Sequence, residues 1–279
     1  MNNFFENYYN QLKENHFLYP EIELKALLKY SIKKPKEIFL YNLNHENIDL
    51  KKFQSAFNRR LKKEPISKII KSKEFWSEEF YVNSSVLDPR PESELIIETA
   101  QKLFVNKSKT LRIADLGTGS GCLAIILAKI YINSKLIATE IDTKAIRVAK
   151  INISKHQLTH RIKILNCNWI NKFSKFDLII SNPPYLSDID YSKTDEEVKL
   201  YEPQIALRGG KDGLKSFREI ATSINNLLDK DSYFLTEIGY GQLEDVRRIF
   251  DEKDMYIYKI VKDLQSIDRV LVFKKKNEK

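Results

Sequence analysis

Four consecutive residues, Asn182-Pro183-Pro184-Tyr185, are suited to holding a flat group that carries an NH2. Asn182 offers a side-chain carbonyl oxygen as a hydrogen-bond acceptor. Pro183 offers a backbone carbonyl, and the two successive prolines stiffen the loop that presents it. Tyr185 offers a ring face against which a planar amide or base can pack. We therefore expect Asn182, Pro183, Pro184 and Tyr185 to form the catalytic part of a site.

A glycine-rich turn, Asp115-Leu116-Gly117-Thr118-Gly119-Ser120-Gly121, lies upstream, between an expected strand and an expected helix. Glycines there allow a tight turn and let the backbone come close to a ligand. The spacing G-x-G-x-G differs from the G-x-G-x-x-G of dinucleotide sites. The carboxylate of Asp115 would repel a pyrophosphate, whereas it suits the ammonium of a methionine moiety. The turn therefore predicts a site for an adenosyl cofactor.

Two further side chains are candidates for the same cofactor. Glu140 ends the next expected strand, about 20 residues on, where an acid accepts hydrogen bonds from two ribose hydroxyls. Asp142 is a second candidate for that role. An acid at a strand end can also be a surface residue without a function in binding. Trp169 either stacks on an adenine or belongs to the core.

An amide-holding loop beside an adenosyl site predicts methyl transfer to an amide or amino nitrogen. The lone pair of an amide nitrogen is delocalised into the carbonyl, so such a site needs acceptors that hold the N–H groups and aim the lone pair. Positioning of this kind contributes on the order of 7–11 kcal/mol in the best intramolecular systems.

The elements that must position these residues alternate between strand and helix after Lys109. Such alternation is typical of a mainly parallel sheet with helices on both faces, whose ligands bind beyond the carboxyl ends of the strands. The expected strands are 111–115, 135–140, 162–165, 176–180 and 233–238, with two closing strands at 257–261 and 270–273.

The chain before this region is organised differently. Residues 1–72 show apolar residues at helical spacing, with Pro20, Pro35 and Pro65 between the pieces, and predict a small helical bundle without catalytic spacing. Residues 73–92 predict a hairpin linker. Residues 93–279 form the α/β domain, whose first helix we expect Ser93 to cap.

Composition narrows the class further. The chain has 279 residues and a net charge of +9, which favours nucleic acid or acidic protein partners but equally fits a lysine-rich proteome. Its two cysteines, Cys122 and Cys167, have no metal-ligand spacing, so we expect no metal site and a reducing compartment. No apolar run approaches the ~20 residues of a membrane span, and no signal peptide is apparent. We expect a cytoplasmic monomer without membrane attachment.

The ordered motifs resemble the HemK/PrmC family of class I S-adenosylmethionine-dependent methyltransferases, over essentially the whole length. Members methylate the glutamine of the Gly-Gly-Gln motif in class I peptide chain release factors. The segments that carry the resemblance are LDPRPESE at 87–94, DLGTGSG at 115–121, SNPPY at 181–185, Glu202-Pro203, Ala206-Leu207, Gly209-Gly210, Asp212-Gly213-Leu214, Glu237-Ile238-Gly239 with Gln242, Asp263-Leu264 and Ile267-Asp268-Arg269.

The resemblance implies an α/β fold with a class I, Rossmann-like seven-stranded sheet, a small N-terminal helical domain that binds the release factor, and a β-hairpin linker. It implies S-adenosylmethionine as cofactor, a release factor as partner and no obligatory nucleic acid. The loop 182–185 would hold the substrate glutamine. The resemblance implies cofactor contacts from Gly117, Thr118, Gly119, Ser120, Gly121, Glu140, Trp169 and Asn182. Asp115, argued above from its place before the turn, completes the expected cofactor site.

This sequence departs from the family pattern at four positions. Glu140 stands where aspartate is usual, Asn168 replaces an aspartate, Asp88 replaces an apolar residue, and Lys71 replaces a glycine. Three other functions remain as alternatives: methylation of a ribosomal-protein glutamine, N6 methylation of adenine in nucleic acid, and a binding protein without activity. The Pro-Arg-Pro-Glu segment favours the release-factor branch over the ribosomal one.

Overall fold

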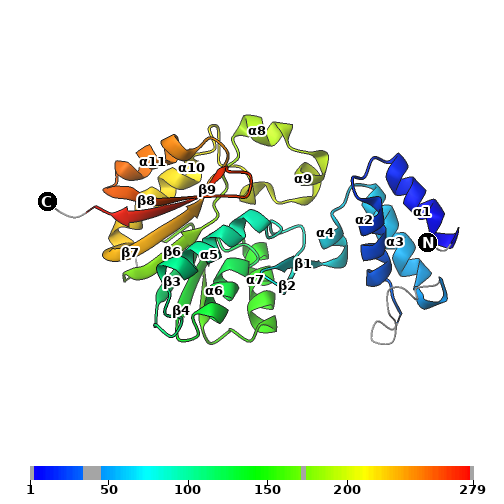
Figure 1. Cartoon of the computed structure of the whole chain (residues 1–279), viewed down its shortest axis with the longest axis horizontal. Helices are drawn as coiled ribbons and strands as arrows, with labels where there is room; N and C mark the ends of the chain where they lie inside the picture. The colour runs from blue at the N-terminus through cyan, green and yellow to red at the C-terminus, as the bar shows by residue number, and fades with distance from the viewer. Residues whose placement is uncertain (1–2, 34–44, 171–173, 277–279) are drawn as a thin grey trace. The chain divides into compact units, whose positions relative to one another are not determined.

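The computed structural model describes residues 3–33, 45–170 and 174–276 (Figure 1). The chain divides into two compact units. The helical unit comprises Met1–Ser72 and Glu196–Tyr201, and the sheet unit comprises Lys73–Asp195 and Glu202–Lys279. The short segment 196–201 therefore belongs to the helical unit, although it lies far along the chain, inside the segment 93–279.

The helical unit packs amphipathic helices around an apolar cluster that includes Leu24, Phe53 and Phe57, each at most 2% exposed. Pro20 begins one helix and Asp49 caps another, its side chain accepting from the backbone N–H of Lys52 at 3.1 Å. The predicted break at Pro35 lies outside the described residues. The helices are α1 (Asn3–Glu14), α2 (Pro20–Tyr30), α3 (Leu50–Leu61), α4 (Ile66–Ile70) and α9 (Glu196–Tyr201), with a 3-10 turn η2 (His45–Asn47).

Helix α9 is held in this unit by a buried arginine. Arg60, 6% exposed, donates to both carboxylate oxygens of Glu23 at 2.6 and 2.9 Å and to Glu197 of α9 at 2.9 Å. The Tyr201 hydroxyl donates to the carbonyl of Lys62 at 2.8 Å. A charge as deeply buried as that of Arg60 requires such partners, which explains why a segment distant in sequence joins the bundle.

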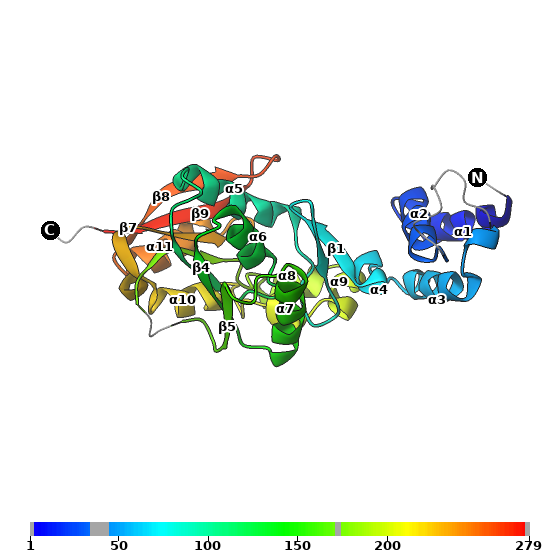
Figure 2. The same ribbon diagram turned by 90° about the horizontal axis from the view of Figure 1, so that it is seen from below.

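The sheet unit is built on seven strands in the order β5-β4-β3-β6-β7-β9-β8. The pairs from β5 to β7 are parallel, and β9 is antiparallel to both β7 and β8. This confirms the predicted α/β architecture. Figure 2 shows the strands from a second side. Their bounds are β3 (Arg112–Leu116), β4 (Lys135–Glu140), β5 (Ile162–Asn166), β6 (Phe176–Ser181), β7 (Leu228–Glu237), β8 (Met255–Lys262) and β9 (Asp268–Lys275).

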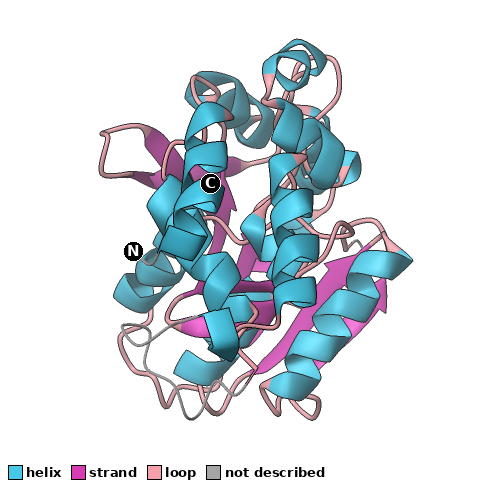
Figure 3. Cartoon of the chain, turned by 90° about the vertical axis from the view of Figure 1, so that its right-hand side faces the viewer, coloured by secondary structure: helices cyan, strands magenta, loops and turns pink. Residues whose placement is uncertain are grey.

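Helices pack on both faces of the sheet because its central strands are buried on both sides, as in other parallel sheets. One core contains residues of α5 (Glu94–Leu103), α6 (Cys122–Ile130) and α7 (Thr143–Lys155). A second core contains residues of α10 (Lys215–Ala221) and α11 (Leu243–Asp251). In Figure 3 the strands are magenta and the helices cyan. Short elements complete the unit: η3 (Pro91–Ser93), α8 (Asp188–Lys193), η4 (Gln204–Ala206) and η5 (Ile224–Leu227).

The hairpin consists of β1 (Ser72–Phe75) and β2 (Glu78–Tyr81). Its two turn residues, Trp76 and Ser77, both have positive φ (54° and 57°), as a tight two-residue hairpin turn requires. Phe75 and Phe80 are buried in the first core of the sheet unit. Within the described residues, no helix is long and apolar enough to cross a membrane.

Candidate active site

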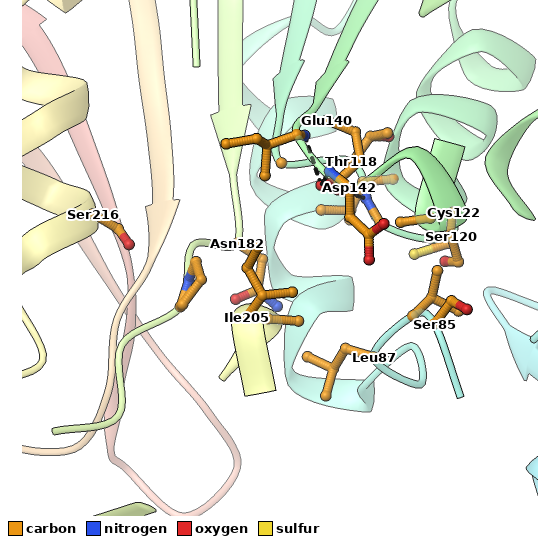
Figure 4. A pocket seen from close by; sticks show the side chains of 18 of the residues that line it. Ser85, Leu87, Thr118, Ser120, Cys122, Glu140, Asp142, Asn182, Ile205 and Ser216 are labelled. Atoms are coloured by element: carbon orange, nitrogen blue, oxygen red, sulfur yellow. Dashed lines mark hydrogen bonds between the residues drawn. The ribbon is translucent and has the colours of Figure 1, made fainter. Parts of the chain in front are cut away.

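A cavity of about 270 Å³ lies beyond the carboxyl ends of β3, β4 and β6 (Figure 4). This is where ligands bind in open parallel sheets. Eight of the residues singled out from the sequence line it: Gly117, Thr118, Gly119, Ser120, Glu140, Trp169, Asn182 and Pro184. The sheet thus brings the glycine-rich turn and the Asn-Pro-Pro-Tyr loop, about 60 residues apart in sequence, to one cavity.

Four of the singled-out residues do not line the cavity. Gly121 is the first residue before α6, with φ +83°. Pro183 is buried, and Tyr185 is half-buried and packs against the second core. Asp115 is 1% exposed and lies beneath the turn, where its Oδ2 accepts from Thr118 Oγ1 at 2.6 Å.

The turn nevertheless fits a methionine-bearing cofactor. Asp115 Oδ1 is buried without a hydrogen-bond partner among the described residues, and burial raises the pKa of this carboxyl to about 7. A cation beside it would favour its charged form. Gly117 has φ +74°, and a Cβ there would lie 3.2 Å from the ring of Trp169. A side chain at position 117 would therefore be strained by the positive φ and would crowd the indole of Trp169.

Glu140 organises the loops around the cavity. Its Oε2 accepts from the backbone N–H of Gly119 at 3.0 Å, and its Oε1 accepts from the N–H groups of Ile141 and Asp142 at 2.8 and 3.0 Å. A carboxylate has about four acceptor positions, so one is left for a ribose hydroxyl. Asp142 caps α7 through Lys144 N at 2.8 Å and also lines the cavity. Both acids thus remain candidates for the ribose.

Trp169 both lines the cavity and packs against the second core, so the two roles considered for it are compatible. Its φ is +54°, and its Nε1–H donates to Glu219 Oε2 at 2.8 Å, which fixes the ring plane. Asn168 donates to the same oxygen at 3.4 Å. An aspartate at position 168 would repel Glu219. No motif or spacing singled out Glu219, because its contact with Trp169 spans 50 residues.

Residues later in the chain pack against the backbone of the Asn-Pro-Pro-Tyr loop. Gln242 Nε2 donates to the Tyr185 carbonyl at 2.9 Å. Gly213 has φ +78°, and a Cβ there would collide with the same carbonyl oxygen. A Cβ at Gly209 would likewise lie 2.8 Å from the Pro184 carbonyl oxygen, so the glycines of the Gly-Gly and Asp-Gly-Leu segments leave room for the backbone of this loop.

Ser93 does not cap α5, contrary to expectation. It stands at the start of the helix, but its hydroxyl donates to Glu237 Oε2 at 2.5 Å instead of accepting from the backbone. Ser93 Oγ also accepts from Asn182 Nδ2 at 2.8 Å. The Tyr185 hydroxyl donates to Glu237 Oε1 at 3.3 Å. The hydrogen bonds with Glu237 and Asn182 turn the Ser93 hydroxyl toward these two side chains, and it accepts from no N–H of the helix.

Burial raises the pKa of Glu237 from 4.5 to about 7. The hydrogen bonds from Ser93 and Tyr185 lower its pKa, the charge of Glu92 raises it, and the charge of Arg269 lowers it. Because the folded protein holds this proton more tightly than the unfolded chain, Glu237 reduces the free energy of unfolding as the pH rises from about 4.5 to 7. A shift of this size corresponds to about 3 kcal/mol.

We therefore expect Glu237→Gln to gain stability relative to the wild type as the pH rises from 5 to 8, by up to about 3 kcal/mol. Urea unfolding of both proteins at the two pH values measures this difference. Asp115 titrates in both proteins, so its contribution cancels. A difference in unfolding free energy that is the same at pH 5 and pH 8 contradicts the prediction.

Comparisons with known proteins agree with this architecture. Residues 90–199 match the model of the methyltransferase small domain family. The release factor glutamine methyltransferase of Clostridium acetobutylicum is 32% identical over 95% of this chain and 94% of its own. The bifunctional methyltransferase of Rickettsia typhi is 40% identical over 90% of this chain. The chain spans about half the length of that relative, 53%. The crystal structure of a ribosomal protein L11 methylase from Lactobacillus delbrueckii subsp. bulgaricus shares the fold, with a TM-score of 0.52 and 17% identity over 74% of this chain and 90% of that chain.

Proposed function

The chain belongs to the release factor glutamine methyltransferase family, and from this premise we propose that it transfers a methyl group from S-adenosylmethionine to a glutamine side-chain nitrogen. The substrate is the glutamine of the Gly-Gly-Gln motif in class I peptide chain release factors. One observation carries the proposal: the carbonyl oxygen of Asn182 is available in the cavity that the glycine-rich turn shapes. Because release factors act in translation, the reaction takes place in the cytoplasm.

In the proposed mechanism the protein acts by positioning. When bound, S-adenosylmethionine supplies an electrophilic methyl group on a cationic sulfur. The turn residues 117–120 would hold its methionine part, and Glu140 or Asp142 would hold its ribose. Asn182 Oδ1 accepts a hydrogen bond from one N–H of the substrate amide, which directs the nitrogen lone pair at the methyl carbon. The N–CH3 bond would form as the S–CH3 bond breaks, the sulfur would leave as a neutral thioether, and the nitrogen would lose one proton to water. The roles of Asp115, Gly121, the Pro183 carbonyl and the Tyr185 ring stay predictions from the sequence, since none of these four residues lines the cavity.

Label transfer tests this function. The protein is incubated with methyl-labelled S-adenosylmethionine and, separately, with a release factor, ribosomal proteins, duplex DNA and RNA. We expect label in the release factor, on the peptide that contains Gly-Gly-Gln. A release factor whose Gly-Gly-Gln glutamine is replaced by alanine is the matched control and should remain unlabelled. Label in ribosomal protein or nucleic acid alone overturns the proposal.

We also propose that the helical unit binds the release factor. A lone glutamine offers few contacts, so binding energy from the rest of the substrate has to order its amide. Three apolar side chains stand out at the start of α2: Leu18, Tyr19 and Ile22 are 86%, 65% and 66% exposed. Grouped within five residues of chain, they are suited to contacting a protein partner.

Replacing Leu18 and Ile22 together by serine should raise KM for the release factor about 10-fold or more, because burying one large apolar side chain contributes ~1.5–3 kcal/mol. Cofactor affinity should stay unchanged. Steady-state kinetics and calorimetry measure the two quantities. Val105→Ser is the matched control, because Val105 is 77% exposed in the sheet unit. An unchanged KM in the double variant rules this surface out.

A further inference from the structure

Three polar side chains from distant segments meet at the start of the Asn-Pro-Pro-Tyr loop, and two of them, Ser93 and Asn182, line the cavity. Ser93 comes from the start of α5, Asn182 follows β6, and Glu237 ends β7. Ser93 and Glu237 are 3% and 2% exposed. The hydrogen bonds run from Asn182 Nδ2 to Ser93 Oγ at 2.8 Å and from Ser93 Oγ to Glu237 Oε2 at 2.5 Å. None of the site roles described above uses Ser93 or Glu237.

The order of donors in this chain has one consistent direction. Above the pKa of about 7 that burial gives Glu237, its carboxylate is ionised and only accepts hydrogen bonds, so the single hydroxyl proton of Ser93 goes to Glu237. Ser93 Oγ is then left with lone pairs only and can only accept from Asn182. The NH2 of the Asn182 side chain must therefore face Ser93, and its carbonyl oxygen must face the other way. Among the described residues, none donates to that carbonyl oxygen.

This orientation matters for an amide substrate. A flipped Asn182 would present NH2 to the NH2 of the incoming glutamine, and two donors cannot pair. A side-chain amide that rotates freely would offer the wrong group for part of the time. Glu237 also accepts from the Tyr185 hydroxyl through its other oxygen, Oε1, at 3.3 Å. One buried carboxylate thus connects to both ends of the loop 182–185.

We propose that Ser93 and Glu237 are positioning residues that lock the Asn182 amide with its carbonyl oxygen toward the methyl acceptor. This inference rests on the proposed function, because it gives the Asn182 oxygen its task in amide methylation. It adds two residues to the machinery: Ser93, which also lines the cavity, and Glu237, which does not.

The test compares variants of the full-length protein with and without the serine hydroxyl. Ser93→Ala removes the acceptor of the Asn182 NH2, so we expect kcat to fall by about 10- to 100-fold, the size of effect that misplacing a reacting group produces. The KM for S-adenosylmethionine should stay within about two-fold, because the cofactor does not depend on this amide. Ser93→Thr keeps a hydroxyl and should recover most of the lost kcat.

A matched control separates this effect from general damage to the core. Thr236→Val removes another buried hydroxyl, 0% exposed, from the neighbouring position in β7, and should keep kcat near the wild-type value. Thermal melting establishes that each variant is folded. Should Ser93→Ala not fold, Glu237→Gln replaces it, because a glutamine NH2 can donate to Ser93 and so lets the hydroxyl proton turn to Asn182. Its kcat is expected to fall by at least about 10-fold.

The decisive measurement is the coupling between Ser93 and Asn182. If Ser93 acts through Asn182, Ser93→Ala should lower single-turnover rates by less than about two-fold when Asn182 is already alanine. A full kcat in folded Ser93→Ala, or an equal fall with and without Asn182, overturns the inference and leaves the proposed function standing. A wild-type protein that does not methylate release factor overturns the proposed function and this inference with it.

Discussion

Replacing Asn182 with alanine is expected to slow methyl transfer to release factor by about 10² to 10³-fold, the loss seen when one oriented group that acts in the transition state is removed. Asn182 lines the cavity, its Nδ2 lies 2.8 Å from Ser93 Oγ, and its Oδ1 is the acceptor offered to an amide N–H of the substrate. Because the hydrogen bond between Oδ1 and the substrate aims the nucleophile, its loss should lower the rate of the chemical step far more than cofactor affinity.

Single-turnover label transfer gives the rate, and calorimetry gives the dissociation constant for S-adenosylmethionine. Asn133→Ala is the control for a generic asparagine substitution, since Asn133 is exposed and its side chain donates to the carbonyl of Ser108. A near-normal single-turnover rate in Asn182→Ala removes Asn182 from the catalytic role.

Glu140→Ala is expected to weaken cofactor binding about 100-fold, with little effect on the rate at saturating cofactor. A hydrogen bond to a charged acceptor contributes roughly 1.5–3 kcal/mol, and the one acceptor position left on Glu140 suits a ribose hydroxyl. The substitution also leaves the N–H of Gly119 without its acceptor, so the glycine-rich turn loses a support.

Calorimetry measures this loss, and Asp142→Ser is the matched comparison. Asp142 caps α7, and serine keeps a capping side chain while removing the charge. If Glu140 holds the ribose, Asp142→Ser should bind the cofactor nearly as well as the wild type. The reverse result, with Asp142→Ser weak and Glu140→Ala normal, assigns the ribose to Asp142.

Much of the fold could be predicted because its causes are local. Apolar runs of strand length alternate with helical periodicity after Lys109, and such alternation leads to a parallel sheet with covered faces. The bounds of six strands follow within two residues, and the expected 135–140 coincides with β4 (Lys135–Glu140), whereas β7 begins at Leu228, five residues before the expected 233. The glycine-rich turn and the loop 182–185 were found for the same reason, since each carries its chemistry in consecutive residues.

The sequence by itself thus determined the fold class and the two loops that line the cavity. The tertiary structure alone decided which distant side chains form hydrogen bonds with one another. Ser93 was expected to cap a helix, yet its partners are 89 and 144 residues away. Helix α9 joins the helical unit through Arg60, 137 residues earlier. Periodicity and spacing report only on neighbours along the chain, whereas buried hydroxyls and charges take whichever partner packing brings within hydrogen-bond distance.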